Sequence, residues 1–421
     1  MKIRAKQNSF CRIGVVSGLV VVLTVGFWML NQPVSTIATA QTTLGGPLPN
    51  LTPLETTMFN TGAIPFAKAW DPQQGLGPVY TQLACTGCHS APAGGGNSNK
   101  KQTFFGTINT DGSFNPLINE GGIQLQNQSV ARFKPNCVLA PESVPADATV
   151  ITKHQSPPLF GLGLVDNIAD ADIQAQAIDK GSGVHGMPNM VTDENGVLRV
   201  GHFGLKAEFA DLVQTSAGAL QHDIGITNPL FPVEDNPNGQ PAPQLCLTST
   251  EPNDSGTQML DIFHFVAYLA PNTPGAGNAN GQALFTSVGC ALCHLPTYTT
   301  KANVVMPVIW GGRTIISKAL SQQPVNLYSD LLLHDMGTAL GDGFVFGQST
   351  GTQWRTSPLW GLSVRISSGL GLLHDGRAKD ANTAILDHSL DNTGEAVTVI
   401  NNFKALSASD QADLIAFISS L

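Results

Sequence analysis

Two short stretches, Cys85-Thr86-Gly87-Cys88-His89 and Cys290-Ala291-Leu292-Cys293-His294, share the pattern C-x-x-C-H and begin 205 residues apart. In a helical turn, positions i, i+3 and i+4 lie on the same face, so each stretch can aim two thiols and one imidazole at a single ligand. This is the attachment motif of c-type haem: the cysteines bind the vinyl groups and the histidine binds the iron. We therefore expect two haems, one at each motif.

A single C-x-x-C-H could instead be half of a zinc site or a redox-active dithiol. A zinc ribbon needs its second cysteine pair roughly 15–20 residues from the first, whereas these motifs lie 205 residues apart. The two copies therefore favour haem. A length of 421 residues suggests two domains. We expect a first haem domain over residues 41–270 and a second over residues 271–421, joined by the Pro- and Gly-rich segment 271–278.

The composition predicts short regular elements. Only 12% of residues are charged, and 44 glycines and 27 prolines interrupt the chain. We expect a mainly α fold with extensive irregular loops and few short strands. Apolar residues recur at helical spacing in residues 258–269 and 409–421, and Ser407 or Ser409 can cap the second of these helices. These two helices are expected to close the two haem domains.

Residues 1–40 have the features of an export signal. Four basic residues precede the apolar run 13–30, and Ala38-Thr39-Ala40 is a small-residue cleavage site. We therefore expect an exported, periplasmic protein. The apolar run is long for a signal peptide, so an uncleaved membrane anchor is the alternative.

The net charge is acidic. Loss of residues 1–40, which hold four basic and no acidic side chains, would take it from −9 to −13. Such a chain does not suit nucleic acid. It suits a small basic electron-donor protein, such as a c-type cytochrome or a cupredoxin.

Two cysteines, Cys137 and Cys246, follow the export segment but lie outside both motifs. In an oxidising compartment we expect them to form a disulfide that joins loops. A pair of buried free thiols is the alternative.

The two halves repeat more than the haem motif. The stretch Ser156-Pro157-Pro158-Leu159-Phe160-Gly161-Leu162 recurs as Thr356-Ser357-Pro358-Leu359-Trp360-Gly361-Leu362, and Phe203-Gly204-Leu205-Lys206-Ala207 has the counterpart His374-Asp375-Gly376-Arg377-Ala378. The order of elements is the same in both halves, which indicates an internal duplication. The interval between these two repeated stretches is longer in the first half than in the second, which predicts an insertion over residues 166–201.

The order of these motifs, together with Leu333-His334-Asp335-Met336-Gly337, resembles the di-haem oxidoreductase family of peroxidase-like proteins. That family is related to bacterial di-haem cytochrome c peroxidases and to the di-haem oxygenase of methylamine utilisation. The resemblance runs from Gly75 to Leu421. It implies two cytochrome c-like domains, two covalently attached c-type haems and often a calcium ion between them. It also implies that one haem reacts with peroxide while the other relays electrons.

The second axial ligand of each iron decides its role, because a strong sixth ligand makes an electron-transfer haem and an open face makes a reactive one. In the second half, His388 stands where the resemblance implies a sixth ligand, with Met336 and Tyr328 in reserve. Counting ten residues from the repeated alanine gives Ala217 in the first half, and alanine cannot bind iron. We therefore expect peroxide to bind at the first haem.

The resemblance also implies residues that move the peroxide proton. Gln214 stands at the position of a glutamine, and Asp223 stands near the position of a glutamate, that related peroxidases use for this purpose. His222 could do this work instead. Phe203 stands approximately where relatives place a tryptophan between the haems. Three histidines are further candidates for a sixth ligand of the first haem: His154, His185 and His202.

Together these features predict an exported di-haem peroxidase that takes electrons from a donor protein and reduces hydrogen peroxide. Two other functions stay open at this point. One is an electron-transfer cytochrome in which both haems are six-coordinate. The other is an oxidase of a small sulfur compound or of a protein side chain, since a fold does not determine the reaction.

Overall fold

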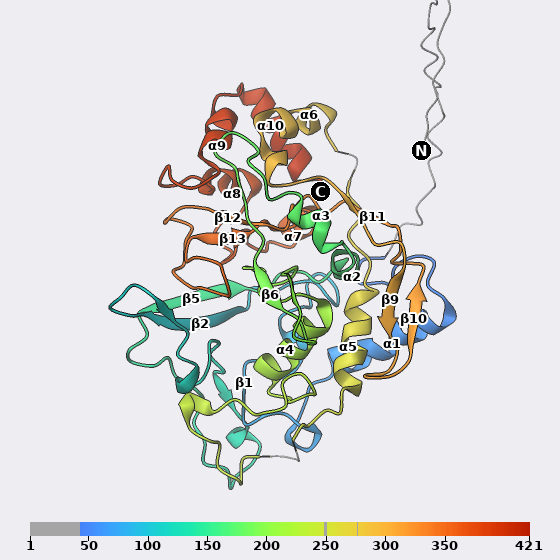
Figure 1. Cartoon of the computed structure of the whole chain (residues 1–421), viewed down its shortest axis with the longest axis vertical. Coiled ribbons are helices and arrows are strands. Elements are labelled where there is room, and N and C mark those ends of the chain that lie inside the picture. The colour runs from blue at the N-terminus through green and yellow to red at the C-terminus, as the bar shows by residue number, and fades with distance from the viewer. Residues whose placement is uncertain (1–42, 248–250, 276) are drawn as a thin grey trace, which may run out of the picture. The chain divides into compact units, whose positions relative to one another are not determined.

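The structure is a computed structural model that describes residues 43–247, 251–275 and 277–421 (Figure 1). Of these residues, 29% are helical and 15% lie in strands. The prediction of a mainly α fold made of cytochrome c-like domains is therefore wrong. Within the described chain, small antiparallel sheets accompany the helices. They form where the glycine- and proline-rich segments lack helical periodicity. Pairing of short strands there supplies the hydrogen bonds that the backbone N–H and C=O groups would otherwise make within a helix.

Helices from the two ends of the first half pack together, and the first of them contacts the turn of the first haem motif. Helix α1 (Pro53–Ala67) begins at a capping box formed by Thr52 and Glu55. It packs along α5 (Thr257–Ala267), and a Cβ at Gly62 would lie 2.0 Å from the backbone oxygen of Asp261. Only glycine allows the two helices to approach this closely. The described residues of this half also form the α-helices α2 (Leu162–Asp166), α3 (Asp170–Gln174) and α4 (Leu212–Ile224).

The second half repeats this helix pair around the second motif. Helix α6 (Ala279–Val288) packs along α10 (Ala408–Ile418), and a Cβ at Gly281 would lie 2.1 Å from the backbone oxygen of Asp413. Ser407 caps α10, so the predicted closing helix and one of its two predicted caps are confirmed. The remaining helices of this half are α7 (Leu362–Ser367), α8 (Ala381–Asp387) and α9 (Val397–Lys404).

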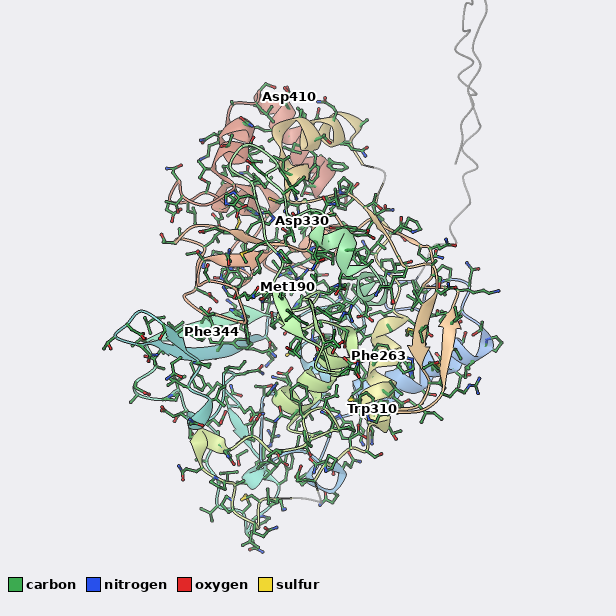
Figure 2. The ribbon with its side chains drawn as sticks, in the orientation of Figure 1. Met190, Phe263, Trp310, Asp330, Phe344 and Asp410 are labelled. Carbon is green, nitrogen blue, oxygen red and sulfur yellow. A yellow bond between two sulfur atoms is a disulfide. The ribbon has the colours of Figure 1, made fainter. Side chains whose placement is uncertain are left out.

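The largest sheet of the described chain lies in the first half. Strand β2 (Lys101–Ile108) pairs with β3 (Phe114–Asn115) on one side and with β5 (Val150–Gln155) on the other. Figure 1 shows β2 and β5 side by side. Phe344, labelled in Figure 2, packs against Phe104 of β2 with ring centroids 5.7 Å apart. The other sheets are the pairs β1 (Val79–Tyr80) with β4 (Gln128–Ser129), β6 (Met190–Thr192) with β7 (Leu198–Val200), β8 (Tyr298–Thr299) with β11 (Pro324–Val325), β9 (Val304–Pro307) with β10 (Thr314–Ser317), and β12 (Leu333–Asp335) with β13 (Gln353–Arg355).

Two apolar clusters form most of the core. The larger one takes residues from both halves, including Phe263 of α5 and Met306 of β9. The smaller one surrounds the second motif and includes Phe285 of α6 and Phe417 of α10. Residues 40–421 group into one compact unit. The predicted boundary between domains at residues 270 and 271 stays a prediction.

The internal repeat is visible in local geometry, with a register that differs by two residues from the one expected. Gly161 and Gly361, with φ of 75° and 79°, begin α2 and α7 in the same way. Later in each half, the bridge Phe203↔Phe209 corresponds to Leu372↔Ala378. Asp211 and Asp380, which cap α4 and α8, match in the same register. The residue of the first half that corresponds to His388 is therefore Ala219 rather than Ala217. Like Ala217, it has no side-chain atom that can bind iron.

Cys137 and Cys246 form a disulfide that closes a separation of 109 residues, which confirms the expected pairing. Replacing both cysteines by serine should lower the free energy of unfolding by about 4–5 kcal/mol, because the unfolded chain regains the entropy of a long loop. Urea unfolding without reductant measures the difference. Dithiothreitol should lower the stability of the natural chain and leave that of the variant unchanged. Equal unfolding free energies for the two proteins would contradict this prediction.

The expected export segment, residues 1–40, lies outside the described residues. In the part of the chain that the structure describes, no helix is both long enough and apolar enough to cross a membrane.

Candidate haem sites

Both C-x-x-C-H motifs fold as the same tight turn. Residues 85–87 and 290–292 form single 3-10 turns, and the histidine N–H donates to the carbonyl of the first cysteine at 2.9 Å in both motifs. The turn places two thiols and one imidazole on one side of the backbone. All four motif thiols are free, whereas the two other described cysteines are joined. This donor set fits two haems attached through thioethers.

The motif histidines are oriented by backbone carbonyls. Nδ1 of His89 lies 3.1 Å from the oxygen of Gly96, and Nδ1 of His294 lies 2.9 Å from the oxygen of Tyr328. Each carbonyl favours a proton on Nδ1, which puts the lone pair of the ring on Nε2, the nitrogen that would bind a metal. The His89 ring also bonds to the backbone of Pro157. Burial lowers the pKa of His89 and lowers the pKa of His294 to about 4. Both rings are therefore neutral at pH 7, as iron ligation requires.

A second imidazole faces the ring of His294. His388 follows α8, and its ring centroid lies 6.5 Å from that of His294 at an interplanar angle of 60°. Its Nδ1 lies 2.6 Å from the oxygen of Ala384, so its Nε2 is also free to bind a metal. With metal–nitrogen bonds of about 2 Å, two imidazoles on one metal have centroids roughly 6 Å apart. The spacing therefore suits one iron between His294 and His388.

Asp223, at the end of α4, lies beside the first motif. Its backbone oxygen accepts from the N–H groups of Thr81 and Gln82, which joins the end of the helix to the loop before Cys85. Burial, followed by the charge of Asp223, raises the pKa of the Cys85 thiol to about 12. A carboxylate is therefore positioned next to the place where the first haem would attach.

Three side chains converge on the Asp223 carboxylate. Its Oδ1 accepts hydrogen bonds from Thr81 Oγ1 at 3.0 Å, Gln102 Nε2 at 2.5 Å and Gln124 Nε2 at 2.6 Å. These donors hold the carboxylate in one orientation. Sequence analysis missed both glutamines, because they lie 121 and 99 residues from Asp223 and no motif links them to it.

A family comparison covers the second of these motifs and most of the chain. The family model described as "Di-haem oxidoreductase, putative peroxidase" matches residues 143–421. The chain belongs to this family. The curated proteins include no match to it. Among solved structures, hydrazine synthase of Kuenenia stuttgartiensis pressurized with xenon aligns with 97% of this chain and 100% of its own, at 12% identity and a TM-score of 0.35. That similarity is too low to support an argument.

The reserve ligands of the second haem are placed less well in this di-haem oxidoreductase than His388. Tyr328 lies on the side of the motif histidine, since its backbone oxygen accepts from His294 and its ring packs against Phe285 with centroids 5.7 Å apart. Met336 is held in the loop after β12 by a backbone bond to Thr352. Neither residue is paired with the His294 ring as His388 is.

Gln214 does not join Asp223 in the structure. It lies in the first turn of α4, where its Oε1 accepts from the N–H of Ala210 at 3.2 Å and its Nε2 donates to Thr192 at 2.9 Å. Asp223 lies nine residues later, which is about 13 Å along the helix axis. The contacts of Gln214 are those of a helix-capping residue, and its catalytic role stays a prediction.

The other first-half candidates have partners of their own. His154 contacts Asp342 at 2.8 Å, His202 contacts Val165 and Asp170 at 3.2 Å, and the backbone of Gly183 lies 3.0 Å from His185. His222 contacts Asp235 at 3.2 Å, and Phe203 is buried in the larger core. The structure therefore does not single out a sixth ligand for the first haem.

A buried ionic network supports the second haem motif. His334 lies between two carboxylates, with Nε2 2.9 Å from Asp330 Oδ2 and Nδ1 2.7 Å from Glu395 Oε2. Lys180 binds Asp330 at 2.7 Å, and Cys293 Sγ lies 3.7 Å from His334 Nδ1. Burial opposes the charge on His334, but its bonds to Asp330, Cys293 and Glu395 raise its pKa to about 12. Asp330 is labelled in Figure 2.

This network connects both sides of the second haem site. Asp330 follows Tyr328, whose carbonyl orients His294, while Glu395 follows His388 by seven residues. His334 therefore ties the loop of the motif histidine to the segment after the opposing histidine. In the sequence His334 is recognisable only as part of the family motif, because its partner Glu395 lies 61 residues away.

Among the residues that the structure describes, no group of three or more His, Cys, Asp and Glu side chains is arranged to hold a metal ion. The expected calcium ion therefore stays a prediction.

Proposed function

We propose that the chain is an exported di-haem peroxidase with covalently attached haems, in which the second haem relays electrons to the first and the first reduces hydrogen peroxide. The pairing of His294 with His388 carries this proposal. Two axial imidazoles suit an electron-transfer haem. The register of the repeat aligns Ala219 with His388, so the matching position of the first half has no ligand atom.

The chain's residues would divide the remaining work. When bound, the haems would supply the electron transfer and the reduction of peroxide. His294 and His388 would hold the second haem from both faces. Asp223, oriented by Thr81, Gln102 and Gln124, would take a proton from peroxide and return it to the departing oxygen.

The alternative functions are separated by the spin state of the purified holoprotein. The peroxidase proposal expects one low-spin and one high-spin haem in at least one oxidation state, together with peroxide consumption. Two low-spin haems at every potential would instead favour an electron-transfer cytochrome. Turnover of a sulfur compound or a protein side chain without peroxide reduction would favour the oxidase.

The location and partners are part of the same proposal. A periplasmic protein cleaved near residue 40 would accept electrons from a small basic cytochrome or cupredoxin, with the acidic surface steering the encounter. Fractionation and N-terminal sequencing test export and cleavage, and metal analysis after dialysis tests for calcium. A protein retained in the membrane fraction with its N-terminus intact would favour the anchor.

Replacing Asp223 with asparagine is expected to slow peroxide consumption by roughly 100-fold or more, because a neutral amide cannot accept the proton. The haem spectra should not change. Asp254→Asn is a matched control, since Asp254 is a buried carboxylate that caps α5 through the N–H groups of Gln258 and Met259. Unaltered turnover in Asp223→Asn, or an equal loss in Asp254→Asn, would remove Asp223 from the mechanism.

A further inference from the structure

A cleft lies between the β2–β5 pair and two loops of the second half. It has a volume of about 460 Å³ and is lined by residues 101, 151–153, 341–342, 374–375 and 377. Small-molecule sites typically have volumes of about 300–1,000 Å³. We refer to it as the basic cleft.

Two lysines in the lining carry unbalanced charge. Lys101 pairs with Gln155 and Lys153 pairs with Thr103, so the two lysines are diagonal neighbours on one face of the strand pair. Both side chains are exposed. In the described chain, neither ammonium group forms an ion pair or a hydrogen bond with the protein. Like charges at this spacing repel each other, so a bound anion would relieve the repulsion.

The two carboxylates of the lining do not balance these lysines, because each already has a cation. Asp342 contacts His154 at 2.8 Å and Lys206 at 3.2 Å. Asp375 contacts Arg377 at 2.8 Å. The lining is therefore positive within a chain whose net charge is −9.

His374 adds a hydrogen-bonding group to the cleft. Its ring stacks on Trp354 with centroids 4.0 Å apart and an interplanar angle of 13°. Within the described residues, its two ring nitrogens form no hydrogen bond with the protein, whereas its backbone oxygen accepts from Gln155 at 2.8 Å. The stacked tryptophan fixes the plane of the ring, and the ring nitrogens are free for a ligand.

The basic cleft adjoins the first haem motif. Lys101 also lines a smaller hollow whose other walls include Cys88 and Gln102, one of the donors to Asp223. A molecule in the cleft would therefore lie on the side of the fold where the first haem attaches.

We propose that the basic cleft binds a small dianionic oxyanion, whose charge is neutralised by Lys101 and Lys153 and whose oxygen accepts a hydrogen bond from His374. Its position beside the first haem rests on the proposed function, but the binding itself does not. The shared chemistry is two negative charges on oxygen atoms, which both inorganic oxyanions and dicarboxylates supply.

Calorimetric titration of the full-length holoprotein with inorganic phosphate, sulfate, malonate and succinate, at fixed chloride, tests the proposal. We expect saturable binding of one ion per chain to at least one of these probes. Phosphate or sulfate alone would identify a tetrahedral oxyanion site, and malonate or succinate alone would identify a dicarboxylate site. The absence of saturable binding for all four probes would overturn the proposal.

Lys101→Gln/Lys153→Gln should weaken that binding at least tenfold. Lys318→Gln/Lys404→Gln removes the same charge from exposed lysines outside the cleft lining and should leave it unchanged. His374→Phe keeps a flat ring against Trp354 and should also weaken binding. If both double variants bound the probe as tightly as the natural chain, the proposal would be contradicted. Equal losses of affinity in both double variants would contradict it as well. Peroxide turnover is measured separately, so loss of the peroxidase proposal leaves this result interpretable.

Discussion

Replacing His388 with alanine is expected to convert the haem at His294 from low spin to high spin. The imidazoles of His294 and His388 face each other with centroids 6.5 Å apart, and both have Nδ1 held by a backbone carbonyl. Removing one of two strong axial ligands opens a face of the iron. Absorption and electron paramagnetic resonance spectra should therefore lose the entire low-spin signal of that haem.

Rescue by added ligand makes this test specific. His388→Gly leaves a space for free imidazole, which should restore the low-spin spectrum in the millimolar range. His264→Ala is the control, because His264 is a buried histidine of the first half whose ring is bonded to the backbone oxygen of Pro307. An unchanged low-spin signal in the alanine variant would show that His388 is not a ligand.

His334 is the second position at which a large effect is expected. Replacing it with glutamine leaves Asp330 and Glu395 in a buried network with only Lys180 to balance them. Loss of one partner from a buried ion pair costs about 3–5 kcal/mol, so the free energy of unfolding should fall by this amount. The low-spin fraction of the second haem should fall as well, because His334 ties the two ligand segments together.

Removing a matching carboxylate should reverse most of the loss. In His334→Gln/Glu395→Gln, Lys180 and Asp330 remain as a balanced pair. A double-mutant cycle by urea unfolding therefore measures the coupling between His334 and Glu395 directly. Additive single effects would show that the network is not coupled. A full low-spin signal in both single variants would limit His334 to a stabilising role.

The contribution of His334 to the free energy of unfolding should change with pH in a defined direction. Because bonds to Asp330, Cys293 and Glu395 outweigh burial and raise the pKa of His334 from 6.5 to about 12, its contribution to stability is complete below pH 6.5 and is lost as the pH rises toward 12. Asp330 and Glu395 have pKa values lowered below 3.8 and 4.5, so their contributions are lost as the pH falls through the acid range. The natural chain should exceed His334→Gln in stability most clearly between pH 4.5 and 6.5. A stability difference between the natural chain and His334→Gln that does not change with pH would contradict this account.

The parts of the sites that lie within one turn of chain could be predicted from the sequence. The two C-x-x-C-H turns have the geometry that their spacing implies, because three groups on one helical face need only local backbone structure. The closing helix capped by Ser407 and the disulfide between Cys137 and Cys246 were likewise predicted. Apolar periodicity and the count of cysteines are properties of the sequence alone.

The fold class and the surroundings of the first site depended on tertiary structure. The mainly α prediction failed because the segments between helices pair as short strands, and such pairing is not encoded in helical periodicity. The same pairing brings Gln102 to Asp223 and places Lys101 near Lys153, although no local pattern marks these residues. The sequence by itself determined which residues can attach two haems. Tertiary structure alone decided which charged and polar side chains surround them, because those contacts join residues from about fifty to more than a hundred positions apart.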